Sequence, residues 1–420
     1  MENKQIDKGK KLTKCYVWLL AICMTNFFGF YKFLPFGKSF YSYDYIHISV
    51  CLVSLMFLLY KVVTRKKIQI KGSFINVYMV LLMLIAVEVI WTYSKYHQPI
   101  SLTFKEAFYY IVPFLGYFTF LQYKENVEFD DVADIIVKAS IITSIVALIV
   151  FTLYTFAGIN ILQLNDSISE NFRNGTIRFS IGTIVANIGI VISITRIMQK
   201  KSKKLDLYNT IVVFLNIWLV DKSRTALLYI IIIVLISMLL GKKVGRLWKV
   251  IILFAIVACV IGVFISYDTV RNEVSVYFNS DAGIMMRFNT IEFYMNQFQE
   301  YPVLGMGLLS SSKDVAGWQL LYGPAGYFYR DDVGIVGLLN KFGICGLLWI
   351  IAFFITIMRI EKKTKLQEGE VVRNIMIYCV VTLINLSFMD FQRVFYMMDI
   401  MILTEMLIVY KKNKLQNNGR

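Results

Sequence analysis

Charged side chains are scarce in this chain of 420 residues, at 17% of its length. A soluble domain carries about a quarter charged residues, so the deficit argues against a water-soluble protein. Hydrophobic residues make up 57% of the chain, and its mean hydropathy is +0.61. Apolar runs of roughly 16 to 27 residues recur along the chain, with no soluble domain visible. The sequence therefore predicts an all-α fold and a single integral membrane domain over residues 1–420.

Residues that commonly hold metals or nucleotides are also rare. The chain has two histidines, His47 and His97, and no set of His, Cys and Asp has the spacing of a metal site. No glycine-rich phosphate loop follows a strand pattern, so we expect no nucleotide site. The six cysteines lie in or beside apolar runs, which predicts no disulfide. We therefore expect neither a metal nor another cofactor.

About twelve apolar segments have the length of membrane-spanning helices. The first follows a basic stretch, and no small-residue cleavage site comes after it, so we expect a retained span rather than a signal peptide. The predicted spans are Tyr16–Tyr31, Asp44–Tyr60, Phe74–Tyr93, Phe104–Gln122, Val132–Gly158, Ile177–Met198, Leu207–Val220, Thr225–Leu240, Leu247–Tyr267, Val333–Met358, Asn374–Phe388 and Val394–Tyr410.

The distribution of basic residues between the connecting segments predicts the orientation. With the N-terminus in the cytoplasm, the inner segments hold most of the 44 lysines and arginines, in agreement with the positive-inside rule. The net charge of +16 then reflects orientation and attraction to anionic lipid, and it needs no nucleic acid partner. The expected location is the cytoplasmic membrane, with many passes and both termini in the cytoplasm.

One short polar stretch, LVDKSRTALL, interrupts the apolar run from Leu207 to Leu240. A single helix of this length would span about 50 Å, whereas the hydrocarbon core is about 30 Å thick. The run therefore predicts two short helices joined by a DKSR turn at the outer face. Arg224 then lies at or just below the membrane surface, where a cation is costly without an anionic partner. A simple polar hairpin tip is the alternative interpretation.

The longest stretch outside the predicted spans is the extracytoplasmic loop 268–332, between the ninth and tenth spans. Apolar residues at steps of three and four predict an amphipathic helix in this loop, with Asp281 as its N-cap and Pro302 after its end. Arg287 flanks the apolar stripe, and a helix lying on lipid would also let this arginine snorkel. The GMG sequence at 305–307 indicates a tight turn or a close backbone contact. The stripe residues are Ile284, Phe288, Ile291, Met295 and Phe298.

Two adjacent aspartates follow an arginine at the end of this loop, in the segment YRDDVGIV. Asp331 and Asp332 are either interfacial charges paired with Arg330 or a partly desolvated pair of carboxylates. Two close carboxylates raise the pKa of one of them, which would suit a general base. Asn340 and Lys341 interrupt the next apolar run, which predicts a short interfacial helix and a break before the true span.

Three of these pieces, in their order and on the same predicted side of the membrane, resemble the O-antigen polymerase and O-antigen ligase family. They are SRTALL at the start of an outward helix, an arginine followed by EYPVLGMGL in one long external loop, and LLNKFGICGLL after a polar pair. The resemblance covers residues 221–351. It implies a multi-span, GT-C-like glycosyltransferase of bacterial envelope polysaccharide assembly, whose product is capsule, exopolysaccharide or O-antigen.

The resemblance places candidate catalytic residues at three positions. Arg224 matches the arginine of SRTA, and Arg287 matches the loop arginine before the Pro-x-x-Gly-x-Gly turn. Asp332 stands about where the ligases of this family have a histidine that acts on the acceptor hydroxyl, and this departure favours a polymerase. The further candidates for binding the substrate are Arg173, Arg178, Arg330 and Asp331.

These residue types suit the chemistry that the resemblance implies. Family donors are glycans linked through a diphosphate to a polyprenol, and arginine stays ionised and binds phosphate bidentately. Arginines at the outer face would stabilise the charge on the departing diphosphate, while Asp332 would take a proton from the acceptor hydroxyl. The expected partners are the lipid-linked glycan donor and acceptor, membrane lipids, and flippase and chain-length regulator proteins.

Two other activities remain open from the sequence. A ligase of the same family would differ only in its acceptor. A lipid-linked oligosaccharide flippase would also have many spans and cationic residues, but transporters of that type usually show related halves and short loops on both sides. This chain shows no internal repeat and has one long outer loop, which favours an enzyme.

Overall fold

The structure is a computed structural model that describes residues 2–25, 44–64, 67–159, 161, 172–173, 176–179, 181–241, 245, 282–313, 315, 317–324 and 326–418. Within these residues the fold is all-α, apart from one pair of two-residue strands. The predicted span Leu247–Tyr267 and the predicted N-cap Asp281 lie outside the described residues.

The described elements are mostly long helices. The α-helices are α1 (Glu2–Met24), α3 (Asp44–Val63), α4 (Ile75–Tyr96), α5 (Ile100–Leu121), α6 (Phe129–Ala157), α8 (Thr183–Met198), α9 (Lys204–Leu215), α10 (Arg224–Leu240), α13 (Ala282–Glu300), α14 (Gly317–Tyr322), α15 (Gly334–Thr364), α16 (Gly369–Thr382) and α17 (Phe395–Asn418). The shorter elements are the 3₁₀-helices η1 (Lys124–Asn126) and η3 (Arg330–Asp332), the π-helix η2 (Asn216–Asp221), and the antiparallel strands β1 (Phe172–Arg173) and β2 (Thr176–Ile177).

Apolar helices of membrane-spanning length run through the described chain. Every predicted span inside the described residues overlaps a helix. Four of the described helices, α3, α4, α6 and α15, are long and apolar enough to cross a membrane, and α8 and most of α10 are shorter apolar helices. Large apolar side chains on the outside of these helices are exposed, such as Leu59 at 62% and Met83 at 64%. Such a surface suits lipid rather than water, which indicates a membrane protein.

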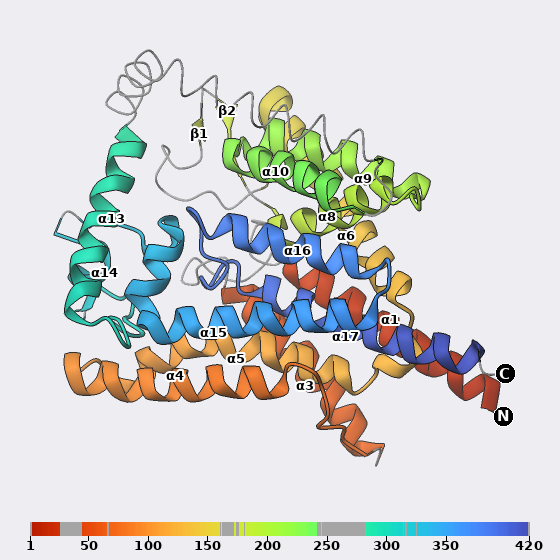
Figure 1. Cartoon of the computed structure of the whole chain (residues 1–420). Helices are drawn as coiled ribbons and strands as arrows, with labels where there is room; N and C mark the ends of the chain where they lie inside the picture. The colour runs from red at the N-terminus through yellow and green to blue at the C-terminus, as the bar shows by residue number, and fades with distance from the viewer. Residues whose placement is uncertain are drawn as a thin grey trace.

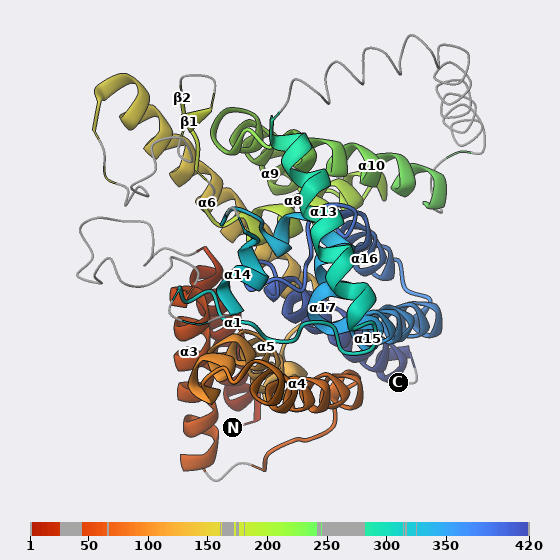
Figure 2. The same cartoon turned by 90° about the vertical axis from the view of Figure 1, so that its left-hand side faces the viewer.

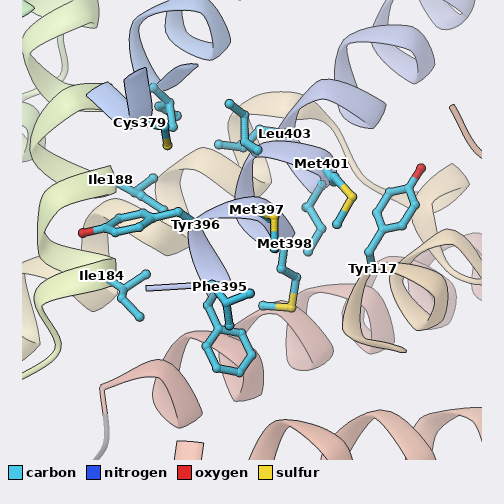
Figure 3. Close-up of a cluster of buried hydrophobic side chains, with 14 of the residues drawn as sticks. Tyr117, Ile184, Ile188, Cys379, Phe395, Tyr396, Met397, Met398, Met401 and Leu403 are labelled. Atoms are coloured by element: carbon cyan, nitrogen blue, oxygen red, sulfur yellow. The ribbon is translucent and has the colours of Figure 1, made fainter. Parts of the chain in front are cut away.

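Helix α17 forms the centre of the bundle. Residues 394–407 are all buried, and a helix that is buried on every side has to be surrounded by other elements. Helix α17 packs against α5, α6, α15 and α16. Figure 3 shows Tyr396 beside Ile184 and Ile188 on one side of the helix, and Met401 toward Tyr117 on the other. The dense packing fixes the start of α17 and the segment that leads into it.

The two ends of the bundle carry different segments. Both termini lie at one end, as the predicted topology requires, whereas α13 and α14 lie at the opposite end (Figure 1). We refer to these as the terminal end and the loop end. Figure 2 views the loop end and shows α13 lying across it.

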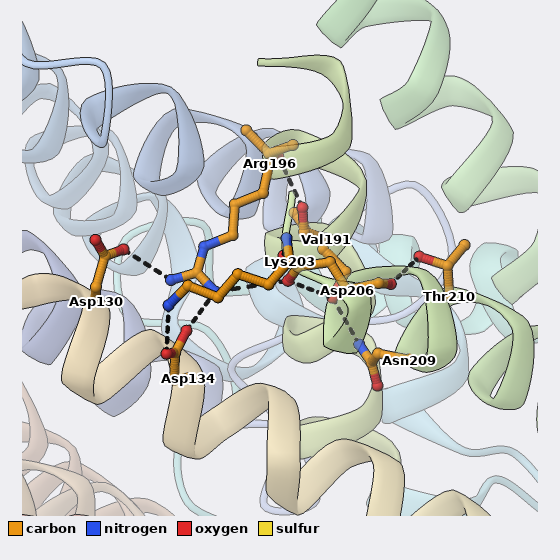
Figure 4. Close-up of polar contacts among 10 residues, drawn as sticks. Asp130, Asp134, Val191, Arg196, Lys203, Asp206, Asn209 and Thr210 are labelled. Atoms are coloured by element: carbon orange, nitrogen blue, oxygen red, sulfur yellow. Dashed lines mark hydrogen bonds and ion pairs between the residues drawn. The ribbon is translucent and has the colours of Figure 1, made fainter. Parts of the chain in front are cut away.

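Ion pairs join three helices at the terminal end (Figure 4). Arg196 of α8 is 5% exposed, and its guanidinium lies 2.8 Å from Asp130 and 2.7 Å from Asp134 of α6, and 3.5 Å from Asp206 of α9. Lys203 adds a contact with Asp134 at 2.5 Å. A buried cation is tolerated when carboxylates surround it in this way. The cluster therefore fixes α6, α8 and α9 relative to one another.

Helix α15 is broken near its start, as the polar pair Asn340 and Lys341 predicted. The break falls at Gly343, which has φ 60° and ψ −157° inside an otherwise helical segment. Only glycine adopts this conformation readily. A short helix at the loop end is therefore followed by the longer apolar helix, which runs toward the terminal end.

The break leaves helical backbone groups without their usual partners, and the loop segment 302–307 satisfies them. The Met306 N–H donates to the carbonyl of Asn340 at 2.7 Å, and the Ile344 N–H donates to the carbonyl of Pro302 at 2.8 Å. Further backbone hydrogen bonds join Gly307 to Lys341 and Cys345 to Val303. The long loop is therefore tied to α15 through main-chain hydrogen bonds.

Two glycines allow this close approach. A Cβ on Gly305 would lie 2.5 Å from the Asn340 carbonyl oxygen, and one on Gly343 would lie 2.2 Å from the Val303 carbonyl oxygen. Both distances are shorter than any ordinary Cβ contact. The GMG sequence thus marks a close backbone contact, one of the two interpretations that the sequence allowed.

Candidate functional site

Asp332 lies within electrostatic reach of arginines from three other segments of the chain. It lies in η3, at the loop end just before α15. Burial raises the pKa of the Asp332 carboxyl, Arg393 opposes that rise, and Asp331, Arg287 and Arg178 follow as weaker electrostatic influences. The three arginines come from the connection between α16 and α17, from α13, and from the residue after β2. We refer to Arg178, Arg287 and Arg393 as the arginine cluster.

Arg178 is anchored to the predicted DKSR turn. Its Nε–H donates to the carbonyl of Asp221 at 2.9 Å. Asp221 ends the π-helix η2, and Ser223 caps α10 by accepting a hydrogen bond from the Ala226 N–H at 3.2 Å. The predicted turn between two short helices is thereby confirmed. The hydrogen bond holds the strand pair against the start of α10.

Two other predicted arginines are placed by their backbone. Arg224 is the first residue of α10 and follows directly after the turn that Arg178 contacts. Arg173 lies in β1, where it pairs with Thr176 of β2. Their side chains lie outside the described part of the chain. The backbone therefore places Arg224 shortly after Asp221, whose carbonyl binds Arg178, and leaves the contacts of the Arg224 side chain open.

Arg287 lies on α13, whose bounds agree with the predicted loop helix. The buried positions of α13 are Thr290 and Tyr294, whereas Ile291, Met295 and Phe298 of the predicted stripe are half-buried. Tyr294 is fully buried, and its hydroxyl donates to the carbonyl of Leu321 at 2.5 Å, while the Asn340 amide donates to Gln297 at 2.8 Å. Phe288 of the stripe is 53% exposed. Polar anchors therefore orient α13, and Arg287 stays exposed at the loop end.

Arg330 has a different environment from its two aspartate neighbours. It is 6% exposed, and its Nη1 donates to the carbonyl of Gly307 at 3.1 Å. Arg330 and Lys341 both favour the charged form of the Glu88 carboxyl in α4. Among the ion pairs of the described residues, none joins Arg330 to Asp331 or Asp332. Arg330 thus stabilises the turn of the long loop at Gly307 through this hydrogen bond to its backbone.

Arg393 and its partner Asp390 were not predicted from the sequence. Asp390 is 2% exposed, accepts a hydrogen bond from the Arg393 N–H at 2.6 Å, and forms an ion pair with the Arg393 guanidinium. Burial raises the pKa of the Asp390 carboxyl, and Arg393 opposes the rise. The signal in the sequence was the pair of charges in MDFQR, between two predicted spans. Asp390 fixes the backbone and the guanidinium of Arg393 together.

A small polar pocket lies beside this pair. Asp331 and Asp390 line it together with Arg330 and Lys341, and Ser387 closes one side. A larger apolar groove between α6 and α9 is lined by aliphatic side chains and one threonine. That groove belongs to the apolar surface, so only the smaller pocket bears on the chemistry of the loop end.

Neither histidine lies in a catalytic arrangement. His47 of α3 packs against the rings of Tyr109 and Phe395, each with centroids 4.7 Å away. His97 is the left-handed residue that ends α4. In the part of the chain that the structure describes, no group of three or more His, Cys, Asp or Glu side chains could hold a metal ion.

The arrangement offers two chemical capacities at one place. Three guanidiniums can bind an anion of high charge, with phosphate oxygens as the natural match for their geometry. A carboxylate with a raised pKa is a stronger base than an ordinary aspartate, which suits it to accept a proton. No protein-family model matches the chain, and no curated protein matches it either. The function is therefore inferred from the residues of the site and from the motifs in the sequence.

Proposed function

We propose that this protein is a membrane glycosyltransferase that polymerises lipid-linked oligosaccharide repeat units at the outer face of the cytoplasmic membrane. The observation that carries the proposal is that Arg178, Arg287 and Arg393, from three separate segments, all act electrostatically on the carboxyl of Asp332. These four residues come from distant parts of the sequence and lie at the loop end. Apolar helices beneath them suit the polyprenol chain of the donor.

The arginine cluster binds the diphosphate of the donor and stabilises it as it departs. Negative charge grows on the phosphate oxygens as the bond from the anomeric carbon to the diphosphate breaks. Fixed cations that face this charge lower the barrier, because they need no reorganisation during the reaction. Arginine is the suitable cation, because it stays ionised and offers paired N–H donors.

Asp332 acts as the general base. Its carboxylate takes the proton of an acceptor sugar hydroxyl while the hydroxyl oxygen bonds to the anomeric carbon of the donor glycan. The bond between that carbon and the diphosphate oxygen breaks, and its electron pair leaves with the polyprenyl diphosphate. The raised pKa of Asp332 supports this role, because a stronger base takes the proton more readily.

The membrane side of the site follows from charge distribution. The terminal end carries the basic connections, which the positive-inside rule assigns to the cytoplasm. The loop end then faces outward, where lipid-linked repeat units are presented after translocation. Capsule, exopolysaccharide and O-antigen are the products that agree with the resemblance to the O-antigen polymerase and ligase family.

A reconstituted reaction tests the proposal directly. Purified protein in lipid is given synthetic polyprenyl-diphosphate-linked repeat units, and the products are separated by length. We expect a ladder of polymer from the wild-type protein and none from Arg287→Ala. Arg359→Ala is the matched control, because Arg359 is an exposed arginine of α15 near the terminal end, and it should keep full activity.

A strain that lacks the gene distinguishes the rival activities. Single lipid-linked units at the outer face would support a polymerase. Finished polymer that stays on its lipid would point to a ligase, and units trapped on the cytoplasmic side would point to a flippase. Either of the latter two results would overturn the proposed polymerase.

A further inference from the structure

An apolar groove opens on the exposed surface of the bundle between α6 and α9. Its volume is about 290 Å³, close to the lower end of ligand pockets, at about 300 Å³. The hydroxyl of Thr152 donates to the carbonyl of Leu148 at 2.8 Å, so the groove suits an apolar chain rather than a polar ligand. The lining residues are Ile145, Leu148, Ile149, Thr152 and Leu153 of α6 and Val212 of α9.

The groove lies in the half of α6 that is farther from the terminal end. Helix α6 begins beside Arg196, where Asp130 and Asp134 form the ion pairs of the terminal end (Figure 4). The groove starts only at Ile145, and from there to Leu153 it follows α6 for about 12 Å. With the proposed orientation, this half of α6 lies in the outer leaflet, on the side where lipid-linked units are presented.

The groove is continuous with the residues that support Arg178. Ile177 and Phe179 flank Arg178 in the sequence and are buried in one cluster with residues of α6 and η2. Leu148, which lines the groove, packs against the same cluster. Arg178 itself is held at this place by the hydrogen bond from its Nε–H to the carbonyl of Asp221. One packed support therefore carries both the apolar groove and a cation.

Lys222 adds a second cation at this end of the groove. Its Nζ lies 5.8 Å from the centroid of the Phe151 ring, and Phe151 is the neighbour of Thr152 on α6. Lys222 also directly follows Asp221, to which Arg178 is bound. An apolar groove with two cations at its end is complementary to a lipid that has a strongly anionic head.

We propose that this groove binds the isoprenoid chain of the lipid-linked donor, whose diphosphate is bound by Arg178 and Lys222. This inference rests on the proposed function, because it assigns a site to the lipid part of that donor. Phospholipid covers the whole apolar surface, whereas the two cations favour a diphosphate, which carries more negative charge than a phosphodiester. The groove holds the isoprene units next to the diphosphate, and the rest of the chain extends into the bilayer.

Photolabelling tests this site without glycosyl transfer. The probe is farnesyl diphosphate with a diazirine at the end of its chain, added to full-length protein in nanodiscs of phosphatidylcholine. We expect label on residues 145–153 and near Val212, which excess unmodified farnesyl diphosphate removes and excess farnesol does not. Ile149→Trp should raise the Kd of the probe, taken from saturation of the label, by about tenfold, the lower end of the cost of forcing extra atoms into a filled space.

The matched control is Ile142→Trp, two helical turns before Ile149 and outside the groove. Ile149 is 54% exposed and Ile142 is 55% exposed, so the added tryptophan faces lipid in both variants. Neither variant should lower the unfolding temperature, and Ile142→Trp should keep the Kd of the wild type. This comparison separates a filled groove from a general effect of bulk on the surface of α6.

Each possible outcome supports or overturns the inference. Label outside the groove, a Kd for Ile149→Trp within about threefold of the wild type, or an equal loss in Ile142→Trp overturns it. If phosphatidylglycerol removes the label as efficiently as farnesyl diphosphate, the groove accepts any anionic phospholipid, which overturns it as well. If the groove is labelled as expected but the wild type forms no polymer, the isoprenoid site stands and the proposed polymerase fails.

Discussion

The broken helix α15 makes one substitution especially informative. In Gly343→Ala the new methyl group would lie 2.2 Å from the Val303 carbonyl oxygen and 2.4 Å from its carbonyl carbon. These are backbone atoms, so they cannot rotate away as a side chain would. The hydrogen bonds from the N–H groups of Ile344 and Cys345 to the carbonyls of Pro302 and Val303 would have to lengthen or break.

The expected loss of stability follows from these contacts. A non-glycine residue in this conformation costs about 1–3 kcal/mol, and two weakened hydrogen bonds cost about 1 kcal/mol each. Alanine also reduces the conformational entropy of the unfolded chain, which offsets about 0.4–1 kcal/mol of this loss of stability. Gly343→Ala should therefore destabilise the protein by about 2–4 kcal/mol. Polymerisation should fall further than stability alone requires, because the displaced loop carries Arg287.

The control for this substitution is Gly158→Ala. Gly158 has φ 67° at the end of α6, and a Cβ placed there meets nothing within 4 Å. It should lose only about 1 kcal/mol from the positive φ. Thermal unfolding of both variants in the same lipid, with the polymerisation assay alongside, gives the comparison. If the Gly343→Ala protein is as stable and active as the Gly158→Ala protein, the break in α15 does not anchor the loop.

Three further predictions concern the site itself. Asp332→Asn should reduce polymerisation by about 10²–10⁴-fold without weakening donor binding, and Asp331→Asn should cause a smaller loss. If Asp332→Asn loses less than threefold in the reconstituted assay, Asp332 is not the general base. Arg287→Lys should restore little of the activity lost in Arg287→Ala, because a point charge lacks the paired donors of arginine. Full activity in either variant would mean that Arg287 only anchors α13 at the surface. Activity should rise as the pH passes the raised pKa of Asp332, because only the charged carboxylate can take a proton. Arg393→Gln removes the cation that lowers this pKa, so the pH at which activity rises should move upward. An unchanged pH profile in Arg393→Gln would show that Arg393 does not act on Asp332.

Local features of the chain were predictable because their causes are local. A run of 34 residues is too long for one span, and the DKSR turn is found where the charges interrupt it. The break in α15 follows a polar pair and falls on a glycine. The loop helix ends at Glu300, before Pro302. Length, charge and backbone freedom decide such features within a few residues.

The orientation of α13 could not be read from its periodicity. Its apolar residues form a helical stripe, yet the buried positions are Thr290 and Tyr294. Tyr294 and Gln297 hydrogen-bond to α14 and α15, more than 20 residues away in the chain. A polar inner face on a helix is favourable only when the element packed against it offers hydrogen-bond partners. Those partners are a property of the fold, so a stripe of apolar residues says little about which side is covered.

Arg393 was missed for a similar reason. It follows an apolar span and precedes another, so the sequence alone offers no reason to prefer it over an interfacial anchor. Its importance comes from Asp390, which binds its backbone and its guanidinium, and from its influence on Asp332.

The charge distribution itself gives a reason to look at the arginine cluster. With the proposed orientation, in which the terminal end faces the cytoplasm, the positive-inside rule accounts for the basic residues there. The same rule disfavours cations at the loop end, so Arg178, Arg287 and Arg393 lie against the trend that fixes the topology. Arginines from three separate segments nevertheless act on the one carboxylate of Asp332. The proposed diphosphate donor would give these cations a function at this end, because a ligand that binds only the folded protein stabilises it.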